Sequence, residues 1–490
     1  MKHLLSVRTR LRGSDAVLGA SVGFLAGLLL ARRQIYVPFW PIMLLVVALI
    51  VSRKKLWVHI LVAILFGLSL GAWRGEGYIG TLQPYQDFAA QKVSMQATAT
   101  LDAVYGKNGQ LSFEVTHVTF TEPEEIQVPG TIKVSGYGEF AVYRGDVLNI
   151  SGKLYPTRGG KQATMSYAQF ERIGSNQTVI DDLRRKFVAG MQTALPEPLA
   201  SFGLGLLIGQ RNTLPYETSQ ALLMVGLTHI IAVSGYNLTI MLNAARRLTG
   251  EHSKRMTTAV GVGLMMFFLL FAGTSPSIVR AAVVSSLGLA AWYFGRKTRP
   301  LVLLLLAAAI TTYATPIYFW SDISWWLSML AFFGILIIAP QILARMYKKR
   351  QPPLLVQVGV ETLSAELMTI PIIMFIFGQV SLVGLLANIL VASVIPIAML
   401  LSFVAGIAGM FIPLLAGWFA WPAKLVLTYM LDVANALSRI PHVFQTNVYL
   451  SSIDMVLCYG FILLLSVALY QKRKTWFEAI EAIDSQEKLK

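Results

Sequence analysis

The segment 226–237, GLTHIIAVSGYN, holds an imidazole, a hydroxyl and an amide among neighbours that are almost all apolar. His229 and Ser234 are the residue types of a general base and a nucleophile, and Asn237 adds a hydrogen-bonding amide. In a helix His229 and Asn237 would share one face, while Gly235 indicates a break or a close helix contact. Because unpaired polar groups are costly in hydrocarbon, we expect this segment to face protein or water.

Other apolar segments also carry isolated polar side chains. Arg280 lies inside one of them, where an unpaired Arg costs about 2.5 to 3.5 kcal/mol on insertion scales. Glu366 is the expected buried carboxylate of a later segment. Asn388 lies within 380–411, which is too long for one straight span, contains Pro396 and is expected to be broken or re-entrant. The candidate residues for one shared path or pore are His229, Ser234, Gly235, Asn237, Arg280, Glu366 and Asn388.

Three interpretations of these residues differ in chemistry. An intramembrane hydrolase needs a Ser, a His and a carboxylate, but His229 and Ser234 are five residues apart and would lie on different faces of a helix. A structural interpretation has the polar groups join helices by hydrogen bonds. A translocation path is the better account, because His, Asn, Arg and Glu recur on separate apolar segments. We therefore expect no enzymatic activity.

The composition requires a membrane protein. Hydrophobic residues make up 55% of the 490 residues and charged residues only 13%, and the mean hydropathy is +0.60. Cys458 is the single cysteine, which excludes a disulfide framework and a thiolate metal site. The six histidines, at 3, 59, 117, 229, 252 and 442, form no metal-hydrolase motif. We expect no metal ion and no cofactor.

Apolar windows predict a polytopic α-helical membrane protein of about 12 spans that is interrupted by one hydrophilic insert. Three spans are expected near 17–31, 37–51 and 56–73, with the first retained rather than cleaved as a signal peptide. The later spans are expected at 215–245, 256–273, 276–295, 300–319, 323–344, 354–378, 380–411, 414–437 and 452–470. The predicted domains are a three-span unit at 1–74, an extracytoplasmic β domain at 75–178, an interfacial helix and linker at 179–212, a helical core at 213–471 and a cytoplasmic tail at 472–490.

The loops between these spans carry an orientation signal. Basic clusters fall on every second loop, which places those loops and both termini in the cytoplasm and the insert outside, with Arg32-Arg33 as the one basic pair that would lie outside. This topology accounts for most of the net charge of +16. The insert from 74 to 185 has 11 Lys and Arg against 12 Asp and Glu, a net charge of −1, so the overall basicity is no argument for DNA binding. The clusters are Arg53-Lys54-Lys55, Arg246-Arg247 with Lys254-Arg255, Arg296-Lys297-Arg299, Arg345 with Lys348-Lys349-Arg350, and Lys472-Arg473-Lys474.

The hydrophilic insert has the pattern of a small β domain. Five short alternating runs, separated by turn residues, suit a small β-barrel that resembles an OB-fold. Such barrels bind single strands through basic grooves and stacked aromatic rings, although the same residues would also suit a domain that merely caps the membrane part. The runs are 93–104, 111–120, 131–134, 146–154 and 162–172, and the candidate DNA contacts are Lys133, Tyr137, Tyr143, Arg144, Tyr155, Arg158 and Lys161.

The segment 181–209 that follows is predicted to be helical, with Pro196 and Pro198 interrupting it. Its first part carries Arg184, Arg185, Lys186 and Phe187. That pattern fits an amphipathic helix lying on the outer leaflet, or a plain linker.

The order of five short stretches resembles the ComEC competence family over nearly the whole chain. They are GLLIGQR at 205–211, the segment 226–237, PSIVRA at 276–281, WLSMLAF at 326–332, and FGQVSL at 377–382 leading to Asn388 and Pro396. The resemblance implies a channel in the bacterial inner membrane that carries one DNA strand into the cytoplasm during natural transformation. For such a channel we hypothesise phosphate contact for Arg280, and pore lining or helix-break geometry for His229, Ser234, Gly235, Asn237 and Asn388.

The resemblance also predicts what else such uptake requires. Asn237 stands where a second His is common in the family and Gln210 where an acidic residue is usual, so a proton or metal role does not carry over to them. The expected form lacks the C-terminal metallo-β-lactamase-like domain of many members, so another protein must supply the nuclease. The chain has no P-loop, and a cytoplasmic ATP-driven helicase and an extracytoplasmic DNA receptor are expected partners beside DNA and lipid. A transporter for a small solute or lipid, the hydrolase and a scaffold are the alternatives.

Overall fold

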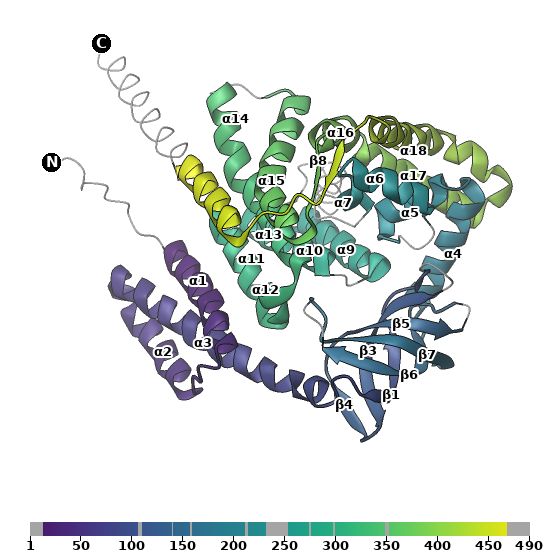
Figure 1. The fold of residues 1–490 in the computed structure, drawn as a ribbon. Helices are drawn as coiled ribbons and strands as arrows, with labels where there is room; N and C mark the ends of the chain where they lie inside the picture. Colours follow the sequence, from purple (N-terminus) through teal and green to yellow (C-terminus); the bar gives the residue numbers. More distant parts are fainter. Residues whose placement is uncertain are drawn as a thin grey trace, which may run out of the picture. The chain divides into compact units, whose positions relative to one another are not determined.

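The structure, a computed structural model, describes residues 13–105, 110–139, 141–156, 159–210, 214–231, 253–273, 276–296, 299–347 and 352–467. Its contacts divide the chain into two compact units. Unit 1 comprises Met1–Asp181 with Met241–Trp326, and unit 2 comprises Asp182–Ile240 with Leu327–Lys490. Figure 1 shows the elements of both units along the chain.

Unit 1 begins with three helices, α1 (Gly13–Arg32), α2 (Trp40–Val51) and α3 (Leu56–Asp87). Glycines at spacings of four bring the backbones of α1 and α3 into direct contact. A Cβ atom added at Gly27 would lie 2.1 Å from the carbonyl oxygen of Leu68, and one at Gly71 would lie 2.1 Å from that of Phe24. This close approach is the small-residue packing that is common between membrane helices, where no hydrophobic effect separates helix from lipid.

Helix α3 extends beyond what a membrane span needs. Its 32 residues exceed the roughly 20 that cross a bilayer core. Tyr85, near its C-terminal end, is 1% exposed and belongs to the hydrophobic core of the sheet that follows. The helix therefore runs continuously from the N-terminal helices into the β domain, as Figure 1 shows.

The predicted β structure of the insert is confirmed. Five long strands pair in a closed cycle, in which β1 pairs with β6, β6 with β7, β7 with β5, β5 with β3, and β3 with β1. The β5–β7 pairing is parallel and the other four are antiparallel. Two short strands, β2 and β4, pair with β3. The strands are β1 (Lys92–Ala99), β2 (Val104–Tyr105), β3 (Leu111–Glu122), β4 (Ile126–Val128), β5 (Ile132–Gly138), β6 (Asp146–Pro156) and β7 (Ala163–Ser175).

Alternation along these strands separates an apolar inside from a polar outside. On β6, Leu148, Ile150 and Leu154 have no exposed surface, while Asn149 and Lys153 between them are exposed. Successive side chains of a strand point to opposite faces, so this period of two buries one face of every long strand. The outer face is left to polar and aromatic side chains.

The later part of unit 1 is helical and packs on the N-terminal helices. It contains α9 (Lys254–Ala272), α10 (Pro276–Tyr293), α11 (Pro300–Ala314), α12 (Ile317–Ser321) and the start of α13 (Ile323–Phe333). Trp320 donates its indole N–H to the carbonyl oxygen of Leu28 at 3.0 Å, and Arg74 donates to that of Tyr313 at 2.9 Å. Arg299 forms an ion pair with Asp15. Helices remote in the sequence are thus tied together.

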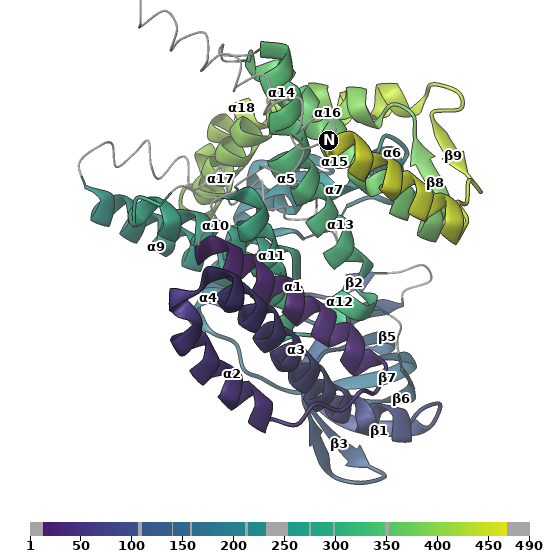
Figure 2. The same cartoon turned by 90° about the vertical axis from the view of Figure 1, so that its left-hand side faces the viewer.

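Unit 2 holds the remaining helices and a two-stranded sheet, in which β8 pairs with β9 (Figure 2). A π-helix at Gly334–Ile338 separates α13 from α14. The elements are most of α4 (Val179–Ala194), α5 (Leu199–Ile208), α6 (Tyr216–Met224), α7 (Thr228–Ile231), α14 (Ala339–Tyr347), α15 (Leu354–Phe377), β8 (Gln379–Ser381), α16 (Gly384–Ala392), α17 (Ile395–Phe411), α18 (Ala416–Ser438), β9 (Phe444–Thr446) and an apolar helix at Ser452–Val467.

Helix α4 occupies the place of the predicted interfacial helix, but one face of it is covered by protein. Phe187 is 2% exposed, and its ring fills the space beside Gly406 of α17. A Cβ atom at Gly409 would lie 1.9 Å from the carbonyl oxygen of Gly190. The face that carries Phe187 therefore packs against α17 rather than against lipid.

The described residues include six helices that are long and apolar enough to cross a membrane, or seven if a bent pair counts as one span. Four shorter apolar helices of 10–17 residues accompany them. The bent pair is α16 with α17, at 54°, and it confirms the predicted break within 380–411. The segment predicted as one span at 215–245 is not one continuous helix, because α6 ends at Met224 and Gly226 adopts a left-handed φ of +74°, and its part from 232 to 245 lies outside the described residues. The count of about 12 stays a prediction.

Candidate functional site

His229 lies in the one-turn helix α7, just after the turn at Gly226. Its Nδ1 is 3.0 Å from the carbonyl oxygen of Gly226. A carbonyl oxygen can only accept, so Nδ1 carries the proton and Nε2 is left to face the next partner. The left-handed turn at Gly226 thus orients the imidazole. The other three predicted residues of this segment, Ser234, Gly235 and Asn237, lie outside the described residues.

Asn388 of α16 joins His229 to Glu366 of α15. Its side-chain amide lies within reach of both the His229 ring and the Glu366 carboxyl group. Asn388 is 8% exposed and Glu366 is partly buried, whereas His229 is exposed, so the cluster is shielded on the Asn388 side only. Gly384, one turn earlier on α16, makes room for the carboxyl group, since a Cβ atom there would lie 3.3 Å from Glu366 Oε1. Three predicted path residues on three helices therefore form one polar cluster.

The amide of Asn388 can connect the two titratable groups in two charge states. With its oxygen toward His229 and its NH₂ toward Glu366, the amide accepts from an imidazolium and donates to a carboxylate. With the amide reversed, it donates to a neutral imidazole and accepts from a protonated carboxyl group. The cluster is satisfied either as an ion pair or as two neutral groups. It therefore tolerates burial in an apolar domain without leaving a charge unpaired.

Ser381, at the end of β8, adds a polar atom that sequence reasoning missed. Its hydroxyl oxygen is buried and has no hydrogen-bond partner among the residues that the structure describes. Cβ atoms added at Gly226 or Gly384 would lie 3.4 and 3.7 Å from the Ser381 Cβ, so the three residues are neighbours. Its place in FGQVSL, a few residues before Asn388, was the available signal.

Arg280 of α10 is buried in unit 1 and lies against the start of α13. It is 1% exposed, and Nη2 donates to the Ser324 carbonyl oxygen at 3.0 Å and to the Ser324 hydroxyl at 3.3 Å. Asp322 accepts the backbone N–H of Ser324 at 2.9 Å and so begins that helix. Nε and Nη1 are buried and have no hydrogen-bond partner among the residues that the structure describes. The guanidinium is thus only partly paired with protein, and its predicted phosphate contact stays a prediction.

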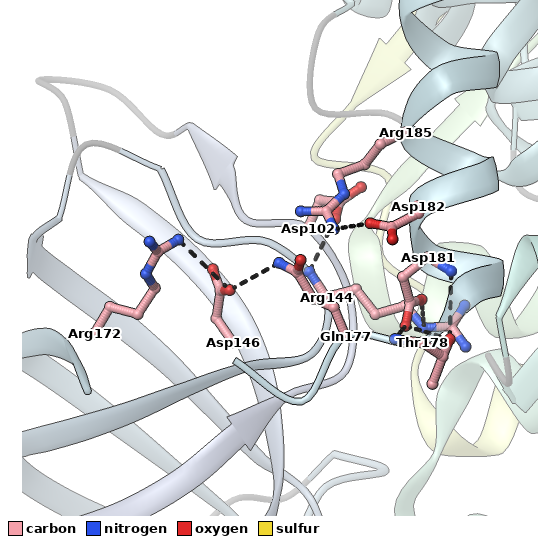
Figure 3. Close-up of polar contacts among 9 residues, drawn as sticks. All are labelled: Asp102, Arg144, Asp146, Arg172, Gln177, Thr178, Asp181, Asp182 and Arg185. Carbon is pink, nitrogen blue, oxygen red and sulfur yellow. Dashed lines mark hydrogen bonds and ion pairs between the residues drawn. The ribbon is translucent and has the colours of Figure 1, made fainter. Parts of the chain in front are cut away.

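Two of the cations predicted to contact DNA on the β domain already have carboxylate partners. Arg144 forms an ion pair with Asp181 at 3.1 Å, and its backbone N–H donates to Asp102 at 3.0 Å (Figure 3). Asp181 also accepts from the Thr178 N–H and hydroxyl at the beginning of α4. Lys161 forms an ion pair with Glu114. Because these charges are neutralised, both residues are weaker phosphate contacts than the sequence alone suggested.

Three of the remaining predicted contacts, Lys133, Tyr137 and Tyr155, lie on the outer face of the sheet. Lys133 is opposite Thr164, which is opposite Tyr155 on the next strand, so the cation and the ring flank one strand. Strand spacing puts their Cα atoms about 10 Å apart. Lys153, which the sequence analysis missed, lies 5.6 Å from the centre of the Tyr155 ring. Tyr137 and Tyr143 are 51% and 42% exposed, and Arg158 lies outside the described residues.

The described residues offer no group of three His, Cys, Asp or Glu side chains placed to hold a metal ion. Gly67-Leu68-Ser69-Leu70-Gly71 has the spacing of a GxSxG motif, but it lies within the continuous helix α3. A nucleophile elbow needs a strand, a sharp turn and a helix instead. Its glycines serve the contact with α1.

These features define a class of membrane protein, with apolar helices long enough to cross a bilayer, a β domain inserted between them and a polar cluster among the later helices. The sequence model of a family described as Competence protein matches residues 206–474, which is more than half of the chain. The chain belongs to this Competence protein family.

One curated relative is ComE operon protein 3 of Bacillus subtilis (strain 168). It is 23% identical over 287 residues, which are 56% of this chain and 36% of the relative. The chain thus matches little more than a third of the relative's length. No solved structure matches the chain.

Proposed function

We propose that this protein acts in DNA uptake during natural transformation, as a channel that carries single-stranded DNA through the bacterial cytoplasmic membrane. The observation that carries the proposal is the His229–Asn388–Glu366 cluster, which three elements of the family region contribute. Ionisable residues within membrane domains commonly mark a substrate or ion path. Membership in the Competence protein family gives the substrate class.

In this proposal the β domain is an OB-type barrel outside the membrane. The closed cycle of five strands, with one parallel pairing, supports that assignment. The incoming strand would contact the outer face formed by Lys133, Lys153 and Tyr155, where two cations flank a ring. The proposed arrangement has about twelve spans and both termini in the cytoplasm.

The proposal leaves the chemistry and the driving force to other proteins. The chain is not an enzyme in this scheme and needs no cofactor. A separate nuclease would degrade the second strand, a DNA receptor outside the membrane would deliver it, and a cytoplasmic ATP-driven helicase would pull the first strand inward. The roles of these other proteins are part of the proposal, which starts from the family membership of this chain.

The test is uptake of labelled DNA by competent cells that lack the gene. Wild type should restore uptake, and Asn388→Leu should not, because the branched chain of similar size removes the amide that joins His229 to Glu366. Ser402→Ala is the control, since Ser402 is buried on α17 and contributes to no part of the cluster. All variants are compared at equal amounts in the membrane.

Unchanged uptake in the deletion strain would reject the DNA channel. The transporter for a small solute or lipid would then take its place, with the same polar cluster. Equal uptake by Asn388→Leu and wild type would instead show that the cluster is not part of the DNA path.

A further inference from the structure

Helix α18 has one buried face and one exposed face. The face buried within unit 2 consists of small and apolar residues. The exposed face carries two charges and a hydroxyl at helical spacing, at Lys424, Thr428 and Asp432, among exposed apolar side chains such as Trp418 and Leu425. Lys424 and Asp432 are both exposed. The buried residues are Ala416, Ala420, Ala423, Leu427, Met430, Leu431 and Ala434.

The charged face lies within a segment long and apolar enough to cross a membrane, Pro413–Ser438. Lys424 is close to its middle, about 16 Å from the first residue at 1.5 Å per residue. A bilayer core is about 30 Å thick, so this ammonium group lies too deep for its stem to carry it fully to the interface. A charge at that depth faces water or protein, because acyl chains cannot solvate it.

A shallow, open depression lies on this face. The described residues that line it all come from α18. They combine a cation, a carboxylate, a hydroxyl and two aromatic rings with apolar side chains. They are Trp421, Lys424, Leu425, Thr428, Tyr429, Asp432, Val433 and Ala436.

We propose that this face of α18 lines a water-filled stretch of the strand path, where Lys424 holds a backbone phosphate and Trp421 and Tyr429 flank the bases. The inference rests on the proposed DNA channel and adds a segment of its path. An ammonium group pairs with a phosphate as a point charge, and aromatic faces stack on bases of any sequence. Trp421 is 60% exposed and Tyr429 42% exposed, so both rings are available.

Asp432 restricts where a phosphate can be held. It lies two turns from Lys424, about 12 Å along the helix axis. Its carboxylate repels phosphates, so the favourable position is at the Lys424 end of the depression. A path must also release what it holds, and an acidic residue beside the basic one keeps the strand from binding too tightly.

The first experiment measures whether water reaches the depression. With the single cysteine removed by Cys458→Ser, Thr428→Cys is exposed in membrane vesicles to a charged, membrane-impermeant thiosulfonate reagent. Leu427→Cys is the matched control, because Leu427 is adjacent in depth but has no exposed surface. We expect Thr428→Cys to react at least tenfold faster than the control, and an excess of a single-stranded oligonucleotide to slow that reaction.

Equal rates at the two positions would overturn the inference. A bifunctional thiol reagent that joins two copies through Thr428→Cys would do the same, since it would make this face an interface between copies. Fast labelling that the oligonucleotide does not slow would leave a water-filled depression but reject the strand as its occupant.

The second experiment compares Lys424→Gln with Lys424→Arg in the uptake assay. We expect at least a tenfold loss with the glutamine and retained uptake with the arginine, which keeps the charge. Equal uptake by both variants would reject the phosphate contact. If deletion of the gene abolishes uptake but Thr428→Cys stays unreactive, only this inference is rejected. If the deletion has no effect on uptake, the proposed function and the strand assignment are rejected together.

Discussion

At the scale of single residues, the bridging amide of Asn388 is the feature with the sharpest consequences. It satisfies an imidazole and a carboxyl group at the same time, and both come from other helices. A side chain that only accepts would serve both groups only as an imidazolium with a protonated carboxyl group, and one that only donates would serve only a neutral imidazole with a carboxylate. The identity of this residue therefore matters more than its volume.

Asn388→Asp tests that requirement by replacing the amide nitrogen with an oxygen. The new carboxylate would face Glu366 and lose the N–H donor, which should destabilise the protein by about 1 to 3 kcal/mol. The thermal midpoint of unfolding in detergent, measured beside Ser402→Ala, checks this. An unchanged midpoint together with normal uptake would mean that the two hydrogen bonds are not needed.

Arg280 should behave as a packing residue rather than as a DNA contact. Arg280→Ala removes charge-assisted bonds to Ser324 and is expected to cost about 1.5 to 3 kcal/mol of stability. The amount of folded protein in membranes should fall, and Arg280→Lys should restore part of it. If the Arg280→Ala protein is present in normal amounts and is defective only in uptake, Arg280 is a DNA contact rather than a packing residue.

The outer face of the β domain should bind single strands through Lys133 and Lys153, for which the described residues offer no carboxylate partner. Lys133→Gln and Lys153→Gln in the full-length protein should each lower the dependence of oligonucleotide affinity on salt by about 0.7 in the logarithmic slope. Lys161→Gln is the control, because Lys161 is already paired with Glu114. The measurement is fluorescence anisotropy at several salt concentrations, and equal slopes for all three variants would contradict the assignment.

At the scale of elements, the helices are held together by close backbone contact where glycines recur. The glycines of α1 and α3 face each other across their contact, and Gly190 and Gly409 do the same between α4 and α17. Contact of this kind relies on shape alone, since neighbouring lipid is as apolar as the helices. Adding even a methyl group at these glycines should therefore strongly destabilise the packing of the two helices.

Two glycines of α3 provide a matched comparison. A Cβ atom at Gly71 would lie 2.1 Å from the Phe24 carbonyl oxygen, whereas one at Gly77 meets nothing within 4 Å. Gly71→Ala should force the helices apart and cost about 1 to 3 kcal/mol, while Gly77→Ala should be neutral or slightly stabilising. Thermal unfolding in detergent compares them, and equal midpoints would show that α1 and α3 do not pack in this way.

At the scale of the whole molecule, the polar residues discussed above belong to two units. Each unit consists of two separate segments of the chain. The β domain and Arg280 belong to unit 1, and the Asn388 cluster and the charged face of α18 belong to unit 2. The Competence family match covers parts of both units. A substitution is therefore best judged first within its own unit.

The orientation across the membrane is a prediction for the entire chain. Basic loops in the cytoplasm place the β domain outside, where Tyr167, which is 82% exposed, would be accessible. In a Cys458→Ser background, Tyr167→Cys should react with an impermeant maleimide in intact cells whose outer barriers have been removed. Labelling only after lysis of the cytoplasmic membrane would invert the topology.

The sequence by itself determined the class of the protein and the nature of its parts. Hydropathy over windows of about 20 residues and alternation with a period of two are local signals, so they predicted a membrane protein with a β insert. The break within 380–411 was visible for the same reason, because the length of the run and Pro396 are both local. The family resemblance rested on the order of short stretches and was confirmed.

Only the tertiary structure decided which polar groups meet. Asn388 lies beside His229 and Glu366, Arg144 pairs with Asp181, and the parallel β5–β7 pairing completes the cycle of strands. Each of these partners lies more than 20 residues away in the chain. Whether a cation is free or neutralised depends on folding that no local pattern records, which is why the sequence selected Arg144 and Lys161 as readily as Lys133 and overlooked Lys153.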